Sequence, residues 1–340
     1  MRKSGDNRPD GGVFPPKVGR WVWACREGSE ATLRGEFERA GQKSRVLAGG
    51  LVESQARPPG VPTFARLGFK VEAVLPWSAE VGKQAASHWK QAVWIQAWVP
   101  DSTLGNRLSK QATKVGGDLL AERRRSGLPV HESAKSASAA GVALGQVLVL
   151  PGWVVLGTLS AEEGDPWVAG GRTRVRRHGE SPSRAAMKLD EALAWKGDAP
   201  GRGDVCVDLG AAPGGWSERL LAMGARVIAI DPGRLREDLM RNKALEHVMA
   251  SAFDYEPAAP VDWLFCDMAW RPLEVAQLLA KWARNGWALH LVANIKLPMR
   301  DKLPMVERVR ETLVAGGWRA LQTRQLYHDR DEITVHARSR

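Results

Sequence analysis

From residue 181 to the end of the sequence, short apolar runs alternate with segments of helical periodicity, and this alternation constrains the fold more than any other feature. The apolar runs predict strands, and they read DVCVDLG, ARVIAID, VDWLFCDM and WALHLVANIKL. Helices are predicted between and after them, at residues 215–223, 235–245, 272–284 and 304–315. The tail WRALQTRQLYHDRDEITVHAR predicts two further strands around a tight polar turn. Strands separated by helices of this length require a mostly parallel α/β sheet, to which the closing hairpin adds one antiparallel strand.

A glycine-rich loop follows the first predicted strand, in the segment VCVDLGAAPGGW. The strand ends at Asp208, and the loop contains Gly210, Ala212, Pro213, Gly214, Gly215 and Trp216. Glycines let a backbone approach a ligand closely, and doubly wound sheets bind ligands at the carboxyl ends of their strands. The loop does not match the G-x-G-x-x-G fingerprint of dinucleotide-binding proteins, which argues against NAD.

An acidic residue, Asp231, ends the second predicted strand, 21 residues after Gly210. A carboxylate at this position can accept both hydroxyls of a ribose. NAD and S-adenosylmethionine both contain an adenosine ribose, so Asp231 does not distinguish between them. The alternative interpretation is a structural turn with a solvent-facing aspartate.

Three charged residues lie where predicted strands end or begin at one edge of the sheet. Asp267 follows the third strand, Lys296 ends the fourth, and Glu332 opens the last. Parallel strands end at one edge, and an antiparallel strand that follows a hairpin begins at that same edge, so we expect the three to converge beside the glycine loop. Lys188 lies on the helix before the sheet. A structural ion-pair network is the alternative interpretation.

Two lysines and two acids held together suit methyl transfer to a ribose 2'-hydroxyl. The hydroxyl is a poor nucleophile at neutral pH until its proton is removed. A lysine removes the proton only when neutral; desolvation and a neighbouring ammonium lower its pKa, whereas carboxylates raise it. We assign Lys296 as the base because its strand-end position is the most rigidly aimed. Lys188, Asp267 and Glu332 would then orient Lys296 and position the ribose.

The composition is that of a globular protein, with 44% hydrophobic and 26% charged residues in 340. No apolar run approaches the roughly 20 residues that span a bilayer, so we expect a soluble, cytoplasmic protein without a membrane partner. A monomer is the expected oligomeric state. The cysteines Cys25, Cys206 and Cys266 lack metal-ligand spacing. They are interpreted as buried free thiols, and no metal is expected.

The net charge of +11 is concentrated in the N-terminal half. Residues 1–180 contain 26 Lys and Arg against 17 Asp and Glu, whereas residues 181–340 contain 23 against 21. Phosphate neutralisation supplies most of the sequence-independent affinity for nucleic acids, so the N-terminal half is predicted to face a nucleic acid. A merely basic domain is the alternative.

Three further segments of the N-terminal half carry a prediction. GQVLVLPGWVVLGTLS predicts a hairpin of strands that turns at Pro151-Gly152. Trp89, Trp94 and Trp98 are interpreted as core or interdomain residues rather than as base-stacking surfaces. The run Arg123–Arg125 is a candidate phosphate contact, although a solvated helix face is the commoner explanation for such runs.

Five segments, in order, carry a specific family resemblance: PSRAAMKLDEA, DLGAAPGGW, CDM, NIKLPM and QLYHDRDEITVH. Together they resemble the RlmM family of ribosomal RNA 2'-O-ribose methyltransferases, a branch of the FtsJ-like enzymes. The resemblance covers essentially all of residues 181–340. It implies a Rossmann-like, S-adenosylmethionine-dependent methyltransferase fold with a mostly parallel seven-stranded sheet. Members have a Lys-Asp-Lys-Glu tetrad, which falls on Lys188, Asp267, Lys296 and Glu332.

Upstream, CREGSEATLRGEFERAG and FARLGF resemble the N-terminal part of the same family, a ferredoxin-like region followed by a THUMP RNA-binding domain. The implied substrate is one cytidine in the peptidyl-transferase loop of large-subunit (23S) ribosomal RNA. We therefore expect a ferredoxin-like region over 20–75, a THUMP-like domain over 76–170, a linker over 171–180 and the methyltransferase domain over 181–340. The charge, glycine and proline at the start of the sequence predict a disordered leader over residues 1–19.

The resemblance also implies S-adenosylmethionine contacts, which together with the loop residues already named give a candidate set of Gly210, Ala212, Pro213, Gly214, Gly215, Trp216, Asp231 and Asp267. Two further positions depart from the family pattern, which has a serine where Ala185 stands and an acidic residue where Ser251 stands. Contacts there are expected to be weaker or made by the backbone. Asp254, three residues on, is a candidate replacement near the adenine.

Three functions remain open at this point. The leading one is 2'-O-methylation of large-subunit ribosomal RNA. The second is the same reaction on another RNA, since FtsJ-like domains use this tetrad on several substrates. The third is a non-catalytic RNA-binding or assembly protein with a decayed fold, against which the intact tetrad and glycine loop argue.

Overall fold

The computed structural model describes residues 13–163, 168–172 and 184–339. The chain divides into two units, residues 1–174 and residues 175–340. The predicted linker lies outside the described residues except for Gly171 and Arg172. Within the described part of the chain, no helix combines the length and the apolar composition that crossing a bilayer requires.

Unit 2 is built on a seven-stranded sheet with the strand order β10-β9-β8-β11-β12-β14-β13. The first five strands in this order are parallel, whereas β14 runs antiparallel to both β12 and β13. The predicted α/β, Rossmann-like fold with a mostly parallel sheet is therefore confirmed. The strands are β8 Val205–Leu209, β9 Arg226–Ile230, β10 Leu245–Val248, β11 Val261–Cys266, β12 Ala288–Lys296, β13 Arg319–Arg324 and β14 Glu332–Arg338.

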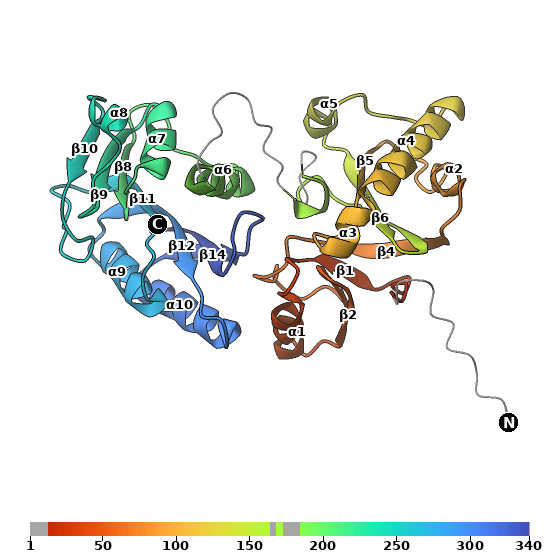
Figure 1. Ribbon diagram of the computed structural model, residues 1–340, viewed down its shortest axis with the longest axis horizontal. Helices are drawn as coiled ribbons and strands as arrows, with labels where there is room; N and C mark the ends of the chain where they lie inside the picture. Colours follow the sequence, from red (N-terminus) through yellow and green to blue (C-terminus); the bar gives the residue numbers. More distant parts are fainter. Residues whose placement is uncertain (1–12, 164–167, 173–183, 340) are drawn as a thin grey trace. The chain divides into compact units, whose positions relative to one another are not determined.

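Helices cover both faces of this sheet, with α6 and α7 on one side and α9 and α10 on the other (Figure 1). Leu189 of α6 and Leu220 of α7 share one buried apolar cluster with Phe265 of β11. Leu279 of α9 and Leu313 of α10 are also fully buried. The helices are α6 Arg184–Lys196, α7 Gly215–Ala222, α8 Glu237–Met240, α9 Pro272–Arg284 and α10 Lys302–Gly316.

One predicted helix of unit 2, over residues 235–245, is wrong for most of its length. Only the single turn α8 forms, and residues 245–248 become the edge strand β10. Asn242 ends the helical stretch, because its side-chain oxygen accepts the backbone N–H of Ala244 and its carbonyl accepts that of Leu245. Asparagine favours such local turns over continued helix.

Unit 1 contains a second seven-stranded sheet, in the order β2-β3-β1-β4-β7-β6-β5, in which only β5 and β6 are parallel. Strand β4 crosses residue 75, so the sheet is continuous across the predicted boundary between residues 20–75 and 76–170. The ferredoxin-like and THUMP-like assignments stay predictions. The strands are β1 Trp21–Ala24, β2 Ser44–Ala48, β3 Leu51–Ser54, β4 Leu67–Pro76, β5 Val93–Trp98, β6 Ala143–Leu150 and β7 Trp153–Leu159.

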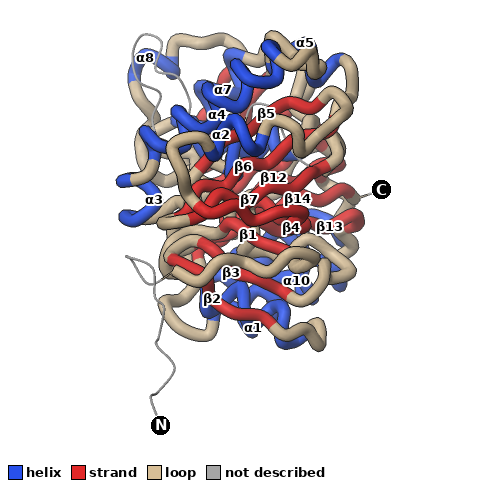
Figure 2. The backbone as a smooth tube through the Cα atoms, turned by 90° about the vertical axis from the view of Figure 1, so that its right-hand side faces the viewer, coloured by secondary structure: helices blue, strands red, loops and turns tan. Residues whose placement is uncertain are grey.

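Helices α2 and α4 lie side by side in unit 1 (Figure 2) and pack on β5, β6 and β7. The predicted hairpin is confirmed as β6 and β7, which turn at Pro151-Gly152. Trp89 and Trp98 are buried and Trp94 is half-buried, in agreement with a packing role. The helices are α1 Glu30–Arg39, α2 Val81–Ala85, α3 Thr103–Arg107, α4 Ser109–Arg125, α5 Ala134–Ala139 and the 3-10 helix η1 Ala169–Gly171.

The described residues correct the extent of the predicted N-terminal leader. Residues 1–12 lie outside them, but Val13 is buried and Gly19 donates a backbone hydrogen bond to Val71. Lys17 also donates its backbone N–H to the carboxylate of Glu53. The prediction that a disordered leader extends to residue 19 is therefore wrong for residues 13–19, which belong to the folded unit.

The described residues also correct the view of Arg123–Arg125 as one basic surface. Arg123 is fully buried, and its guanidinium donates hydrogen bonds to four backbone carbonyls. These belong to Ala86, Trp89, Gln91 and Pro129, at 2.6 to 3.0 Å. Arg123 therefore connects these segments by hydrogen bonds. Of the three arginines, only Arg124 and Arg125 remain candidates for a phosphate contact.

Candidate active site

The carboxyl ends of the parallel strands form one edge of the unit 2 sheet, and the predicted site residues lie along it. In strand order they are Ser251 after β10, Asp231 after β9, the glycine loop 210–215 after β8, Asp267 after β11 and Lys296 at the end of β12. Glu332 opens β14 beside Lys296. An elongated ligand along this edge would run from Ser251 toward the tetrad, as expected for a doubly wound sheet.

The structure brings the four predicted tetrad side chains together. Lys296 and Glu332 are direct partners in the β12–β14 pair, with 3.6 Å between Lys296 Nζ and Glu332 Oε2. Lys188 Nζ lies 2.7 Å from Glu332 Oε1 and 3.4 Å from Asp267 Oδ1. The side chains of Lys188 and Glu332 are only 9% and 5% exposed, whereas that of Lys296 is 46% exposed. Lys296 is thus the accessible lysine of the pair.

The surroundings of Lys188 favour its charged form. Burial lowers its pKa, but the charge of Asp267 and the hydrogen bond that Lys188 donates to Glu332 outweigh burial and raise the pKa overall. Burial raises the pKa of Asp267, an effect that the charge of Lys188 opposes. Lys188 is therefore a fixed cation that holds the two carboxylates.

Two glycines of the glycine loop stand where no larger residue fits. Gly210 has a φ of +77°, and a Cβ on it would lie 2.6 Å from Cγ of Met268. Gly214 has a φ of +112°, and a Cβ on it would overlap Leu239. Such conformations favour glycine. Gly215 then begins α7.

Asp231 joins this loop to the end of β9. Its Oδ2 accepts the backbone N–H of Ala212 at 3.1 Å, and its Oδ1 accepts that of Gly233 at 2.7 Å. A carboxylate oxygen accepts two hydrogen bonds, so each still has an acceptor position for a hydroxyl. The backbone cradle and this carboxylate fit a ligand with a ribose diol.

Ala185 and Trp216, both predicted to bind the cofactor, form a hydrogen bond with each other. Trp216 Nε1 donates to the carbonyl of Ala185 at 2.8 Å, which joins α7 to α6. The indole is 3% exposed and packs edge-to-face on Phe265, with ring centroids 6.0 Å apart. The Trp216 side chain therefore belongs to the core, which leaves only its backbone for the predicted cofactor contact.

The turn after β10 holds the predicted residues Ser251 and Asp254. Ser251 Oγ accepts the N–H of Phe253 at 3.2 Å, and its carbonyl accepts that of Asp254 at 3.1 Å. Asp254 is exposed. Phe253 lies against Trp270, which follows β11, with ring centroids 5.8 Å apart. This aromatic pair at the same edge was not predicted from the sequence.

A buried carboxylate lies beneath the glycine loop. Asp208 Oδ2 accepts a hydrogen bond from Ser217 Oγ at 2.7 Å, which fixes the first turn of α7 to β8. Burial raises the pKa of Asp208 to about 7, although the Ser217 hydrogen bond opposes the shift. The sequence identified Asp208 only as the residue that ends the strand.

The loop between β13 and β14 is ordered by polar contacts that the sequence did not reveal. Asp329 is fully buried, and its Oδ2 accepts the N–H of Leu326 at 2.8 Å. The hydroxyl of Thr334 lies 3.0 Å from the same oxygen and 2.9 Å from Asn294 Oδ1 on β12. Burial raises the pKa of Asp329 to about 8. Hydrogen bonds therefore connect the loop that precedes Glu332 to β12, the strand on which Lys296 lies.

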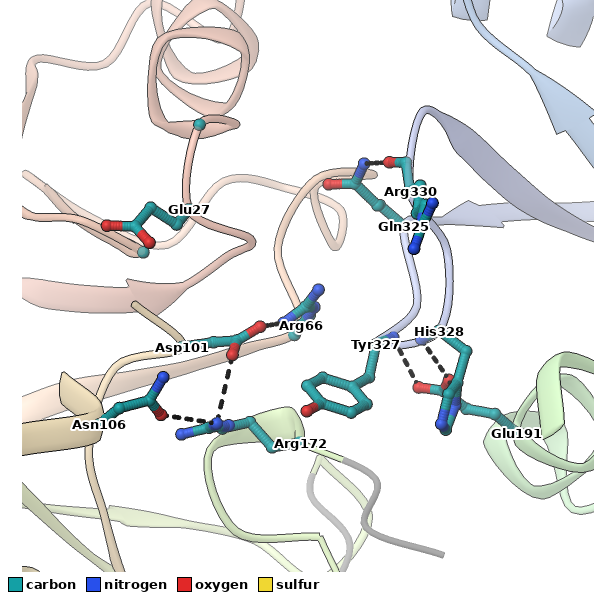
Figure 3. Close-up of polar contacts among 12 residues, drawn as sticks. Glu27, Arg66, Asp101, Asn106, Arg172, Glu191, Gln325, Tyr327, His328 and Arg330 are labelled. Carbon is teal, nitrogen blue, oxygen red and sulfur yellow. Dashed lines mark hydrogen bonds and ion pairs between the residues drawn. The ribbon is translucent and has the colours of Figure 1, made fainter. Parts of the chain in front are cut away.

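In unit 1, the carboxylate of Asp101 lies between two arginines (Figure 3). Arg66 Nη1 is 2.6 Å from Asp101 Oδ2, and Arg172 Nη2 is 3.3 Å from Oδ1. Arg172 also donates to Asn106 at 3.2 Å. Arg66 comes from the FARLGF segment. These arginines connect distant segments of unit 1. Part of the positive charge of unit 1 is therefore neutralised by ion pairs within it.

Comparison with known proteins identifies methyltransferases as relatives of this chain. Residues 182–294 match the FtsJ-like methyltransferase family. A protein of Alkalilimnicola ehrlichii named Ribosomal RNA large subunit methyltransferase M is 35% identical over 94% of both chains. The protein of that name from Halorhodospira halophila is 32% identical over 94% of this chain and 96% of its own. Fibrillarin of Aeropyrum pernix, solved with S-adenosylmethionine, aligns at a TM-score of 0.36 and 19% identity over 57% of this chain and 82% of its own.

Proposed function

This chain belongs to the ribosomal RNA large subunit methyltransferase M family, and from that premise we propose that it methylates the 2'-hydroxyl of a cytidine in the peptidyl-transferase loop of 23S ribosomal RNA. Its cofactor is S-adenosylmethionine, in agreement with the FtsJ-like domain. The observation that carries the proposal is the accessible Lys296 beside Glu332, because Glu332 is held by Lys188 and Lys188 is paired in turn with Asp267.

The cofactor supplies an electrophilic methyl group on a sulfonium. The backbone of residues 210–215 would bind its methionine part, and Asp231 its ribose hydroxyls. Ser251 and Asp254 lie where the adenine is expected. These assignments follow the order of the strands along the sheet edge.

In the proposed reaction, Lys296 acts as the base. Its Nζ would take the proton of the ribose 2'-hydroxyl, and the oxygen could then accept the methyl group that the cofactor would supply. A positioned base of this kind contributes roughly 10²- to 10⁴-fold to a rate. Lys188 keeps its proton, because two carboxylates surround it, and so it keeps Glu332 in place. Glu332 in turn orients the Lys296 ammonium that forms.

The excess positive charge of residues 1–180 supports contact between the N-terminal half and the RNA backbone. Arg123 and Arg66 do not contribute to such a surface, because both side chains are buried and bound within unit 1. Exposed residues such as Arg124 and Arg125 are the better candidates.

Mapping of the modification tests this proposal. Large-subunit ribosomal RNA from cells lacking the protein is incubated with the purified full chain and S-adenosylmethionine, and the product is digested to nucleosides and mapped. We expect a 2'-O-methylcytidine in the peptidyl-transferase loop. A methylated base would overturn the reaction class. Efficient transfer to another RNA, with none to this one, would favour the second function considered above.

A further inference from the structure

Glu191 is a buried carboxylate of α6 that the proposed reaction does not use. It is 6% exposed and follows Lys188 by three residues on the same helix. Side chains three residues apart lie on one face of a helix, so Glu191 and Lys188 are neighbours. Burial of a carboxylate is costly unless hydrogen bonds compensate it, so its contacts indicate its role.

Glu191 binds the backbone of the loop between β13 and β14 (Figure 3). Its Oε1 accepts the N–H of Tyr327 at 2.7 Å, and its Oε2 accepts the N–H of His328 at 2.9 Å. The Nδ1 of His328 lies 2.8 Å from the same Oε2. Two consecutive backbone amides and one imidazole therefore meet a single carboxylate.

The same loop is fixed to the strands that carry Lys296 and Glu332. Gln325 Nε2 donates to the carbonyl of Arg330 at 2.7 Å, which braces the loop (Figure 3). The N–H of Leu297, next to Lys296, donates to the carbonyl of Asp331, next to Glu332, at 2.7 Å. A displacement of this loop relative to α6 would therefore displace Glu332 relative to Lys188.

We infer that Glu191 is a positioning residue of the tetrad, which holds the β13–β14 loop against α6 and so sets the contact between Lys188 and Glu332. The inference rests on the proposed function for the identity of the reaction. A carboxylate is required here, because a glutamine would direct an NH2 donor at one of the N–H groups that the carboxylate accepts. Misplacement of reacting groups by about 1 Å can reduce a rate on the order of a hundredfold.

The test compares Glu191→Gln with wild type in single-turnover methyl transfer to ribosomal RNA at saturating cofactor. We expect the rate to fall about tenfold to a hundredfold. The dissociation constant for S-adenosylmethionine should stay within about twofold, because the hydrogen bonds described for Glu191 hold the β13–β14 loop, which is separate from the glycine loop. Glu191→Asp, which keeps both acceptor oxygens on a shorter arm, should have an intermediate rate. A general loss of structure would change cofactor affinity and rate together.

Asp190→Asn is the matched control, because it removes a neighbouring carboxylate of α6 that contacts Arg219 at 2.9 Å and not the loop. A wild-type rate for a folded Glu191→Gln protein, or an equal loss in Asp190→Asn, would overturn the inference. If Glu191→Gln does not fold, a wild-type rate for Glu191→Asp would overturn it instead. The assay counts every methyl group transferred to the RNA, whatever its position. Methylation of a base would therefore refute the proposed function, whereas the comparison of rates between Glu191→Gln and wild type would remain valid.

Discussion

Lys188 Nζ lies 2.7 Å from Glu332 Oε1, so the helix before the unit 2 sheet and the last strand of the chain meet in one buried ion pair. Lys188 is the enclosed lysine, and its pKa is raised overall because Asp267 and Glu332 outweigh the effect of burial. Lys296 has 46% of its side chain exposed and forms its ion pair with Glu332. The two lysines of the tetrad therefore have different surroundings, which is the basis for proposing that Lys188 holds the carboxylates and that Lys296 accepts the proton.

We expect Lys296→Ala to abolish methyl transfer, with a loss of at least about 10²-fold, because no other accessible base stands beside Glu332 among the described residues of the tetrad. The affinity for S-adenosylmethionine should be nearly unchanged, since Lys296 is separate from the glycine loop. Transfer of labelled methyl groups to RNA and calorimetric cofactor titration check both parts. Lys281→Ala is the control, because Lys281 lies on α9 and pairs with Glu256 rather than with a residue of the tetrad. Normal transfer by Lys296→Ala would remove Lys296 from the base role.

We expect Gly210→Ala to weaken cofactor binding and to destabilise unit 2 by about 1–3 kcal/mol, because the new Cβ meets Met268 at a φ of +77°. Gly201→Ala is the matched control, since a Cβ there meets nothing within 4 Å. Cofactor titration and thermal unfolding of both variants test this. Equal behaviour of the two variants would contradict the role assigned to Gly210.

The stability contribution of Asp208 should depend on pH. Its pKa of about 7 in the folded protein lies above the ordinary value of 3.8, so the folded state binds more protons between these values and loses stability as pH rises through them. Asp208→Asn removes this titration. Relative to wild type, the free energy of unfolding of the variant should therefore increase from about pH 5 to about pH 8, by a few kcal/mol. Denaturant titration at both pH values checks the sign, and a pH-independent difference would contradict it.

We expect Arg123→Ala to destabilise unit 1 by about 3 kcal/mol or more, because it leaves four backbone carbonyls without their charged donor. Arg124→Ala and Arg125→Ala should change stability by less than about 1 kcal/mol, since both form exposed ion pairs. Denaturant unfolding of the three variants measures the difference. Similar values for all three would show that the buried contacts of Arg123 contribute little.

The sequence predicted those features that depend on periodicity and strand order. The alternation of strands and helices gave the parallel sheet of unit 2, and the antiparallel last strand predicted that Lys296 and Glu332 would meet. The edge strand β10 was missed because its four residues, LEHV, follow a helix-like segment that Asn242 interrupts.

The remaining site features depend on contacts between side chains and distant backbone groups, which leave no periodic signal. Glu191 and Asp329 bind loop amides whose positions are set only by the folded hairpin. Arg123 is different, because it continues the buried positions Ala112, Val115 and Leu119 of α4 at helical spacing. Its burial was therefore predictable from the sequence, although the run of three arginines suggested a surface.

The pairing of Lys296 with Glu332 restricts how the length of the hairpin before β14 can change. Side chains alternate between the two faces of a sheet, so a shift of β14 by one residue would turn Glu332 away from Lys296 and move each buried side chain of the strand to the opposite face. A single insertion or deletion that shifts this register removes the carboxylate of Glu332 from the site. A shift by two residues would again direct a side chain of β14 toward Lys296, but that side chain would belong to a different residue. The length of this turn therefore determines whether Glu332 reaches Lys296, just as the identities of the four charged residues determine the charge of the site.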